Sequence, residues 1–84
     1  MFSVYVLYSD TFQRMYVGMS QDVQKRLVQH NAGQNKSTKA YKPWRLLFEQ
    51  GFETRQEARE AELYFKSGIG REFIKSLLNS RRNH

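Results

Sequence analysis

Five side chains in this sequence are of types that do chemistry together rather than alone. They are two phenols, an imidazole, a guanidinium and a carboxylate: Tyr5, Tyr16, His30, Arg26 and Glu62. A phenol or an imidazole can take a proton, and a guanidinium stabilises negative charge that develops on oxygen. One carboxylate among neutral or cationic groups suits a single hard divalent ion that keeps several waters. These are the groups of an acid–base site for an anionic substrate, if the fold brings them together.

Each of these residues also has an ordinary structural explanation. Glu62 precedes Lys66 by one helical turn, and an ion pair between them would contribute roughly 0.2–0.5 kcal/mol. His30 could be a core histidine bonded to a backbone carbonyl, and Arg26 a solvated helix charge. Tyrosine is common in strands, and Gly18 could mark only a bulge or a strand end. Helix geometry alone favours the ion pair for Glu62, whereas the coincidence of all these residues in one small domain favours a site.

The two tyrosines lie on segments with the periodicity of strands. Apolar residues alternate over 2–8 and again over 14–19, with a polar turn between the two runs, which predicts a β-hairpin. In an antiparallel pair, Tyr5 and Tyr16 share a face if Tyr5 stands opposite Gly18. The sequence leaves that register open.

The arginine and the histidine lie on a predicted helix. Ser20 is a suitable N-cap for a helix that continues to about Ala32, and Gly33 follows its end. Arg26 and His30 are i, i+4 neighbours, so they project from nearly the same face. If this helix packs on the hairpin, both side chains can reach the tyrosines.

The second half of the chain predicts a strand and two more helices. Residues 44–52 form an apolar run that we expect to be a central strand, and the capping box at 54–57 begins a helix. Gly68 and Gly70 interrupt the pattern before a short last helix at 72–78. If the helix that begins at the capping box packs beside the first helix, Glu62 can approach the same pocket.

The order ββαβαα predicts a small α/β (α+β) fold, a three-stranded and mostly antiparallel sheet flanked by helices. Residues 1–79 would form a single domain, and residues 80–84 a loose basic tail. The 84 residues contain no cysteine, which excludes disulfides and thiolate metal sites. No apolar run approaches the ~20 residues that cross a bilayer, and the N-terminus lacks signal-peptide features. We therefore expect a cytoplasmic protein that does not bind membrane.

Positive charge is concentrated in one part of the chain. The net charge is +6, and residues 23–48 contain six basic residues and no acidic one. The basic residues are Lys25, Arg26, Lys36, Lys39, Lys42 and Arg45. Within this segment, the polar loop 33–43 is long for a compact domain unless it binds something. Such a patch attracts polyanions, nucleic acid first, although a solvated basic surface would give the same composition.

On one face and rimmed by basic residues, these groups would suit phosphodiester hydrolysis. That reaction needs a base for the attacking water, positive charge for the transition state and a group, usually a metal ion, for the leaving oxygen. A phenol with a pKa near ~10 is a poor base until a cation lowers it. Gly18 would let a phosphate approach the backbone beside Tyr16.

Short segments then follow one another in the order of a known family. They are Ser3-Val4-Tyr5, Tyr16-Val17-Gly18, the helix 22–27 with its arginine, His30-Asn31-Ala32-Gly33, and 52–58 followed by 62–66. Together they resemble the GIY-YIG endonuclease superfamily, as in the N-terminal nuclease domain of the repair protein UvrC and in small stand-alone UvrC-like proteins. The resemblance covers residues 2–78. It departs at Met19, where some members have a lysine, and in having no asparagine after the glutamate helix until Asn79.

The resemblance implies a metal-dependent endonuclease that hydrolyses phosphodiester bonds in DNA, in DNA repair or in processing branched or single-stranded DNA. Glu62 would bind Mg²⁺ or Mn²⁺, and Arg26 would stabilise the transition state. Tyr5, Tyr16 and His30 would share the roles of base and phosphate positioning. The expected nucleic-acid contacts are Gly18, Lys25, Lys36, Ser37, Lys39 and Lys42.

Two other classes of function remain open at this point. The same fold could serve as a nucleic-acid-binding module without turnover. Alternatively, its basic face could dock an acidic protein partner. The chain contains no motif known to recognise particular bases, so a partner protein could also supply specificity to a nuclease.

Overall fold

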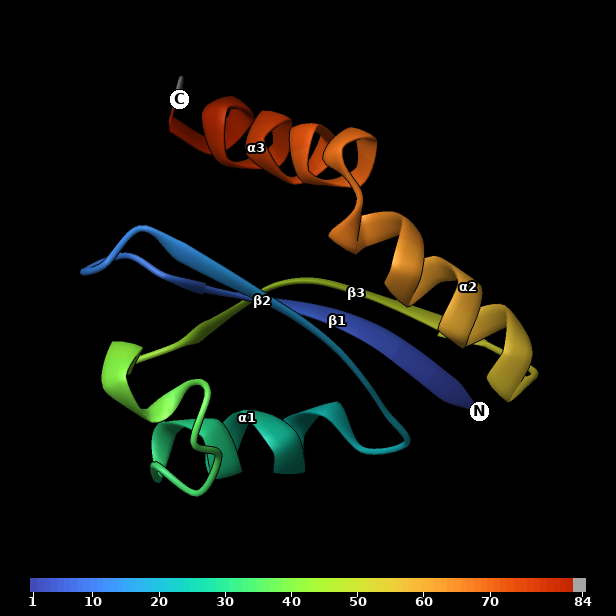
Figure 1. Cartoon of the computed structure of the whole chain (residues 1–84), viewed down its shortest axis with the longest axis horizontal. Helices are drawn as coiled ribbons and strands as arrows, with labels where there is room; N and C mark the ends of the chain where they lie inside the picture. Colours follow the sequence, from blue (N-terminus) through green and yellow to red (C-terminus); the bar gives the residue numbers. More distant parts are fainter. Residues whose placement is uncertain (83–84) are drawn as a thin grey trace.

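The computed structural model describes the backbone of residues 1–82 and the side chains of residues 1–79 (Figure 1). Its elements, in chain order, are β1 (Phe2–Ser9), β2 (Arg14–Ser20), α1 (Val23–Asn31), the short 3₁₀ helix η1 (Lys39–Tyr41), β3 (Arg45–Phe52), α2 (Arg55–Lys66) and α3 (Gly68–Arg82). The expected order ββαβαα and the α+β class are confirmed. None of the helices in the described part of the chain is long and apolar enough to span a membrane.

The three strands form one antiparallel sheet in the order β2-β1-β3. The prediction that the third strand is central was wrong, because β1 has β2 on one side and β3 on the other. Burial agrees with this order: Val4–Ser9 of β1 are all buried, whereas Glu49–Gly51 of β3 are exposed. An apolar run can therefore belong to an edge strand when one of its faces packs against helices.

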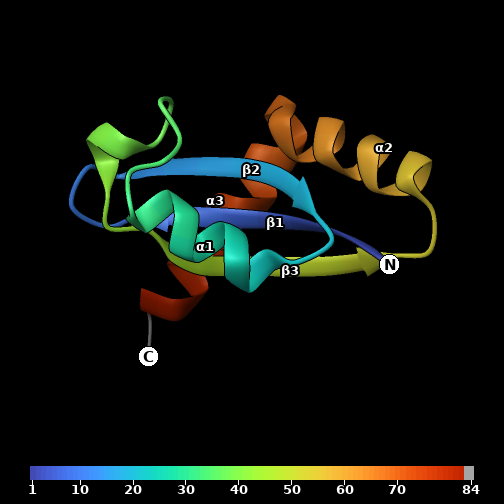
Figure 2. The same ribbon diagram turned by 90° about the horizontal axis from the view of Figure 1, so that it is seen from below.

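Helices cover both faces of the sheet. Figure 2 shows α1 lying across one face, with α2 and α3 on the other. Side chains of β1 alternate between the two resulting cores. Val4 and Val6 pack with α2 and α3, whereas Tyr5 and Leu7 face the α1 side. Tyr5 therefore belongs to the layer beneath α1.

The helix that carries the arginine and the histidine is capped by a different residue than expected. The N-cap of α1 is Asp22, whose carboxylate accepts a hydrogen bond from the Lys25 amide at 3.1 Å. Ser20 ends β2, and its hydroxyl accepts from the Asp22 amide at 2.9 Å. The prediction of Ser20 as the N-cap was therefore wrong. Asp22 is the better cap, because its negative charge also complements the positive end of the helix. Gly33 follows the helix with φ of 77°, as expected for a C-terminal glycine.

The last helix is longer than predicted. Gly68 and Gly70 do not interrupt it but form its first turn, and Ser67 Oγ accepts from the Gly70 amide at 3.3 Å. A Cβ atom on Gly70 would collide with the backbone of Tyr64, so this glycine allows α3 to start close to the end of α2. The expected loose tail is helical as far as Arg82, and residues 83–84 lie outside the described residues.

Candidate active site

The two tyrosines meet on the α1 face of the sheet. The hairpin places Tyr5 opposite Gly18, so Tyr5 and Tyr16 share a face with their ring centroids 6.2 Å apart. A Cβ atom on Gly18 would lie 2.6 Å from the Tyr5 hydroxyl oxygen and 3.0 Å from Tyr16 Cε1. The space above Gly18 is therefore occupied by the phenols. Sequence reasoning had placed a phosphate there, whereas the structure places the Tyr5 ring there.

His30 is buried between two hydroxyl groups. Its side chain is almost fully enclosed, at 2% relative exposure. Its Nε2 atom lies 3.1 Å from the Tyr5 hydroxyl, and its Nδ1 atom lies 2.8 Å from Thr38 Oγ1. The ring centroid is also 4.8 Å from that of Tyr16. The structural alternative was a core histidine bonded to a backbone carbonyl. The partners of His30 are instead two side-chain hydroxyls.

The partners of Thr38 assign the protons of this network. The Thr38 hydroxyl donates to the Asn35 carbonyl at 3.4 Å, and a carbonyl can only accept. Thr38 Oγ1 is then the acceptor for His30 Nδ1–H. This leaves the lone pair of Nε2 to accept from the Tyr5 hydroxyl. The imidazole is held as an acceptor toward the tyrosines.

Burial keeps both members of the Tyr5–His30 pair neutral. Burial first, and then the nearby Arg26 charge, lowers the pKa of His30 from 6.5. Burial, with the neighbouring Tyr16, raises the pKa of Tyr5 from 10.0 to about 12, although Arg26 partly opposes this shift. At neutral pH the proton therefore resides on the phenol, and the imidazole is available to receive one.

Arg26 lies at the open side of this pair. It is exposed on α1, one turn before His30, and its Nη1 donates to Gln29 Oε1 at 3.5 Å. A cavity of about 370 Å³ opens beside the imidazole and is lined by Arg26, Gln29, His30, Gln34 and Asn35. The effect of Arg26 on the pKa of both His30 and Tyr5 shows that its charge reaches the buried pair. An anion in this cavity would meet the guanidinium first.

Glu62 lies on α2 and is mostly buried, with 15% of its side chain exposed. One of its oxygens is 3.4 Å from Lys66 Nζ, and the other is 3.9 Å from Arg59 Nε. The structural alternative of an i, i+4 ion pair is therefore present. The carboxylate also contributes to raising the pKa of Tyr5, so its field extends to the tyrosines. The expectation that α2 packs beside α1 was wrong, because the two helices cover opposite faces of the sheet (Figure 2). Glu62 therefore does not share the α1 layer, and its electrostatic effect on Tyr5 is what links it to the tyrosines.

The donor groups present decide which metal ion they could hold. No cluster of three or more His, Cys, Asp or Glu side chains occurs within the described residues, which rules out an all-protein cage there. A single carboxylate fits a hydrated ion such as Mg²⁺, which commonly binds through one or two carboxylates. Lys66 and Arg59 are 51% and 65% exposed, so both can turn away from Glu62 without being pulled from a core. The donor chemistry fits Mg²⁺ or Mn²⁺.

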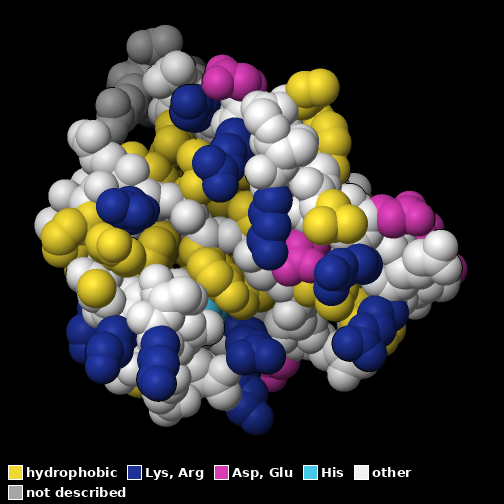
Figure 3. All heavy atoms as spheres, viewed as in Figure 1, with side chains coloured by type: hydrophobic (Ala, Val, Ile, Leu, Met, Phe, Trp, Pro, Cys, Tyr) yellow, Lys and Arg dark blue, Asp and Glu magenta, His cyan; other side chains and the backbone are white. Residues whose placement is uncertain are grey.

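The expected nucleic-acid contacts lie on α1 and the loop that follows it. Lys25, Lys36, Lys39 and Lys42 are all exposed. In Figure 3, several Lys and Arg side chains lie along the lower part of the view, where α1 and this loop are, and others are spread over the rest of the face. Ser37 differs from the lysines, because its amide and its hydroxyl both donate to Asn35 Oδ1, at 2.9 and 2.7 Å. Its hydroxyl proton is used to shape the loop.

Sequence reasoning missed the residues that fix this loop. The Trp44 amide donates to Asn31 Oδ1 at 2.6 Å, and Asn31 Nδ2 donates to the Trp44 carbonyl at 2.9 Å. The Trp44 indole donates to the Thr38 carbonyl at 2.9 Å, which places Thr38 against His30. Asn31 belongs to the quoted His30–Gly33 segment, but no periodicity or motif marked Thr38.

The fold and this site define a small α+β domain with paired phenols and a buried imidazole on one face of a three-stranded sheet. A family model described as the GIY-YIG catalytic domain matches residues 1–72. The chain belongs to this family, whose catalytic domain is that of a nuclease superfamily. The predicted family is confirmed.

Relatives of the same kind support this assignment. The chain is 44% identical over 52 residues to the UPF0213 protein YazA of Bacillus subtilis, a match that spans about half (52%) of that protein. It is 35% identical to a UPF0213 protein of Pediococcus acidilactici, over 94% of this chain and 83% of that one. The solution NMR structure of the UPF0213 protein BH0048 from Bacillus halodurans is similar with a TM-score of 0.54 and 31% identity, covering 92% of this chain and 85% of that chain.

Proposed function

We propose that this protein is a metal-dependent endonuclease that hydrolyses phosphodiester bonds in DNA. The observation that carries the proposal is the buried Tyr5–His30 hydrogen bond, with Tyr16 beside it and Arg26 at its open side. A neutral imidazole whose Nε2 accepts a hydrogen bond from a phenol is an arrangement that can move protons. It occurs within a GIY-YIG catalytic domain.

In the proposed reaction, a water oxygen forms a bond to phosphorus while the bond from phosphorus to a sugar oxygen breaks. The proton of the water passes through the phenols to Nε2 of His30, and the leaving oxygen takes a proton from solvent. Tyr16 is half-buried and Tyr5 is fully buried, so Tyr16 is the phenol that meets the substrate. Tyr5 then connects it to the imidazole.

Arg26 and Glu62 provide the charges that this reaction requires. The exposed guanidinium of Arg26 would bind the phosphate and stabilise the charge that develops on its oxygens. Glu62 would hold Mg²⁺ or Mn²⁺ after Lys66 and Arg59 turn away from it. A divalent ion bound there supplies positive charge for the leaving oxygen. The exposed lysines of α1 and the loop would hold the DNA backbone without reading its sequence.

One observation favours a second candidate, a nucleic-acid-binding module without turnover. Both oxygens of Glu62 face cations of the same helix, which compete with a metal ion for the carboxylate. If Lys66 and Arg59 stay in place, the basic face still binds DNA but the leaving oxygen has no metal-borne charge. The two candidates differ in cleavage and agree in binding.

Cleavage of labelled single-stranded, duplex and branched DNA with Mg²⁺ or Mn²⁺ separates them. The matched pair of variants is Glu62→Gln and Glu60→Gln, because Glu60 is an exposed carboxylate on the same helix. The nuclease predicts cleavage that a chelator and Glu62→Gln abolish and Glu60→Gln leaves intact. Salt-sensitive DNA binding without cleavage by any variant would support the binding module. If the protein neither cleaves nor binds DNA, both candidates are contradicted. The basic face would then be left to an acidic protein partner.

A further inference from the structure

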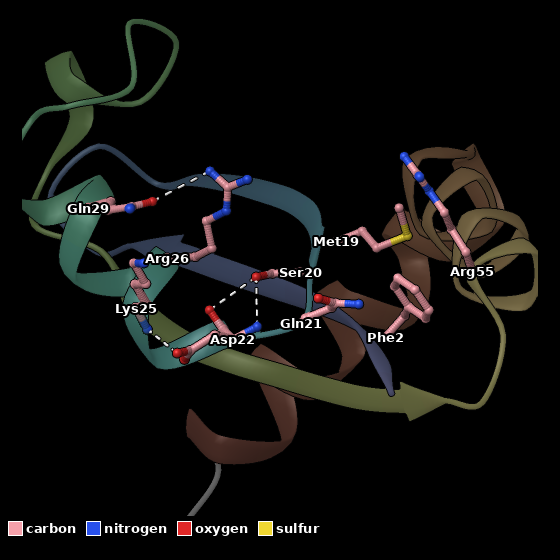
Figure 4. Close-up of a pocket in the computed structure, with 9 residues that line it drawn as sticks. All are labelled: Phe2, Met19, Ser20, Gln21, Asp22, Lys25, Arg26, Gln29 and Arg55. Carbon is pink, nitrogen blue, oxygen red and sulfur yellow. Dashed lines mark hydrogen bonds between the residues drawn. The ribbon is translucent and has the colours of Figure 1, made fainter.

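A second cleft lies between the beginnings of α1 and α2, where β2 ends. Its volume is about 460 Å³, within the range of roughly 300–1,000 Å³ that small-molecule sites occupy. Figure 4 shows Phe2, Met19 and Arg55 on one side of this cleft and Lys25 and Arg26 on the α1 side. No residue of the buried tyrosine–histidine pair lines it.

The cleft combines an apolar surface with positive charge. Phe2 and Met19 are half-buried, so part of each side chain is available to a ligand. Lys25, Arg26 and Arg55 line the same space and are exposed.

The cleft has one negative group, the carboxylate of Asp22 at the N-cap of α1. This carboxylate already accepts a hydrogen bond from a backbone amide at 3.1 Å. Three cations therefore face one carboxylate, which leaves the cleft suited to an anion that carries a flat apolar group.

The cleft is continuous with the candidate active site through two residues. Arg26 and Gln29 line both the 460 Å³ cleft and the 370 Å³ cavity beside His30. A DNA strand with its scissile phosphate at Arg26 would therefore extend into the cleft with its next nucleotide. The shared guanidinium sets the direction of this path, which leads away from loop 33–43 with its three lysines (called the lysine loop below).

We propose that this cleft binds one unpaired nucleotide adjacent to the scissile phosphate. Its base lies against Phe2 and Met19, and the cations that line the cleft attract its phosphate, with Arg55 on the same side as the base. Stacking on an aromatic side chain recognises the face of a base and is tolerant of sequence, which suits a fold that reads no base edges. A base paired within a duplex has its faces covered by its neighbours, so it must be unstacked before it can enter. The inference rests on the proposed function for its location but makes its own prediction about binding.

Titration of the intact protein with thymidine monophosphate, followed by amide NMR in the absence of divalent metal, tests the site directly. We expect the amide signals of Phe2, Met19, Gln21 and Arg55 to shift. Deoxyribose phosphate, which lacks the base, should bind about tenfold more weakly, the loss that removal of one base–aromatic stack typically causes. Shifts confined to the lysine loop, equal affinity for the two ligands, or no shifts at all would overturn the proposal.

Variants make the test specific. Arg55→Gln and Phe2→Leu should each weaken thymidine monophosphate binding by about tenfold, and the second keeps an apolar side chain in the core. Arg71→Gln, an exposed arginine on α3 away from the cleft, should leave binding unchanged. Unchanged binding in both cleft variants would contradict the site. Binding is measured without metal and without cleavage, so the two proposals can fail separately. Absence of nucleotide binding would leave the nuclease proposal intact, and absence of cleavage would leave the nucleotide site in the cleft intact.

Discussion

Thr38→Val removes the hydroxyl that holds His30 while keeping a side chain of similar shape. The Nδ1–H group of His30 then loses an acceptor at 2.8 Å in a position where water cannot replace it. Leaving a buried donor unsatisfied costs about 1–3 kcal/mol. In a domain of this size each kcal/mol lowers the unfolding temperature by roughly 4–8 °C. We therefore expect a fall of roughly 5–20 °C.

A second effect of Thr38→Val concerns the proton on the imidazole. Without an acceptor beside Nδ1, the tautomer with its proton on Nδ1 is no longer favoured, and Nε2 is no longer fixed as the acceptor for Tyr5. Imidazole nitrogen chemical shifts distinguish the two tautomers. We expect the wild-type protein to carry its proton on Nδ1 and the valine variant to lose that preference. Cleavage should fall in parallel, because the proton acceptor of the proposed reaction is lost.

Thr38→Ser is the matched control, since it keeps the hydroxyl and removes only a methyl group. It should retain the wild-type tautomer and most of the stability. The reasoning is refuted if Thr38→Val unfolds at the wild-type temperature with an unchanged tautomer. It is also refuted if serine and valine behave alike, because the effect would then come from packing and not from the hydrogen bond.

Three further predictions follow from the same geometry. Gly18→Ala places a Cβ atom 2.6 Å from the Tyr5 hydroxyl oxygen, so we expect a loss of about 1–3 kcal/mol in urea unfolding, and an unchanged midpoint would contradict the steric role. Because the folded protein lowers the pKa of His30, its stability should be fully present above pH 6.5 and should fall as the pH drops from 6.5 through the lowered pKa. Unfolding midpoints of the wild type over this pH range, compared with those of His30→Gln, measure this dependence. Replacing Lys39 and Lys42 by Gln should weaken DNA binding at all sequences alike, and anisotropy titrations should show a logarithmic salt slope smaller by roughly 0.7–0.9 for each phosphate that is no longer neutralised.

The fold could be predicted where periodicity and local chemistry agree. Alternation over the first two strands indicated the hairpin, and Gly18 opposite Tyr5 is the register at which two tyrosines share a face. The Thr54–Glu57 capping box also begins a helix, as expected, with the Thr54 hydroxyl accepting from the Glu57 amide at 3.2 Å. These features depend on residues close together in the sequence.

The errors arose where packing between distant segments decides the outcome. The glycines at 68 and 70 have the pattern of a helix break, yet Gly70 is needed because α3 starts against the backbone of α2. The third strand is apolar enough to be central, but the order β2-β1-β3 puts it at the edge. Composition and periodicity describe one segment at a time, so they cannot report which neighbour it meets.

The candidate site divides in the same way. Types and spacing predicted Tyr5, Tyr16, Arg26 and His30, and the fold places all four on the α1 side of the sheet. Glu62 was predicted with them but lies on α2, on the opposite side. The catalytic roles of these residues stay predictions. Thr38 was beyond reach, because its contact with His30 depends on the path of an irregular loop that Trp44 holds in place. Only the three-dimensional structure could show that the loop completes the hydrogen bonding of the histidine.

The central claim is that the buried tyrosine–histidine pair is the proton-moving part of a nuclease. Single-turnover cleavage of labelled DNA with Mg²⁺, by the wild type, Tyr5→Phe and Tyr64→Phe, tests it most directly. Tyr64 is an exposed tyrosine on α2, 46% accessible, and provides the matched control. The account predicts that Tyr5→Phe stays folded and loses about 10²–10⁴-fold in rate, the usual contribution of acid–base catalysis, while Tyr64→Phe cleaves like the wild type. Cleavage by folded Tyr5→Phe at the wild-type rate would contradict the claim.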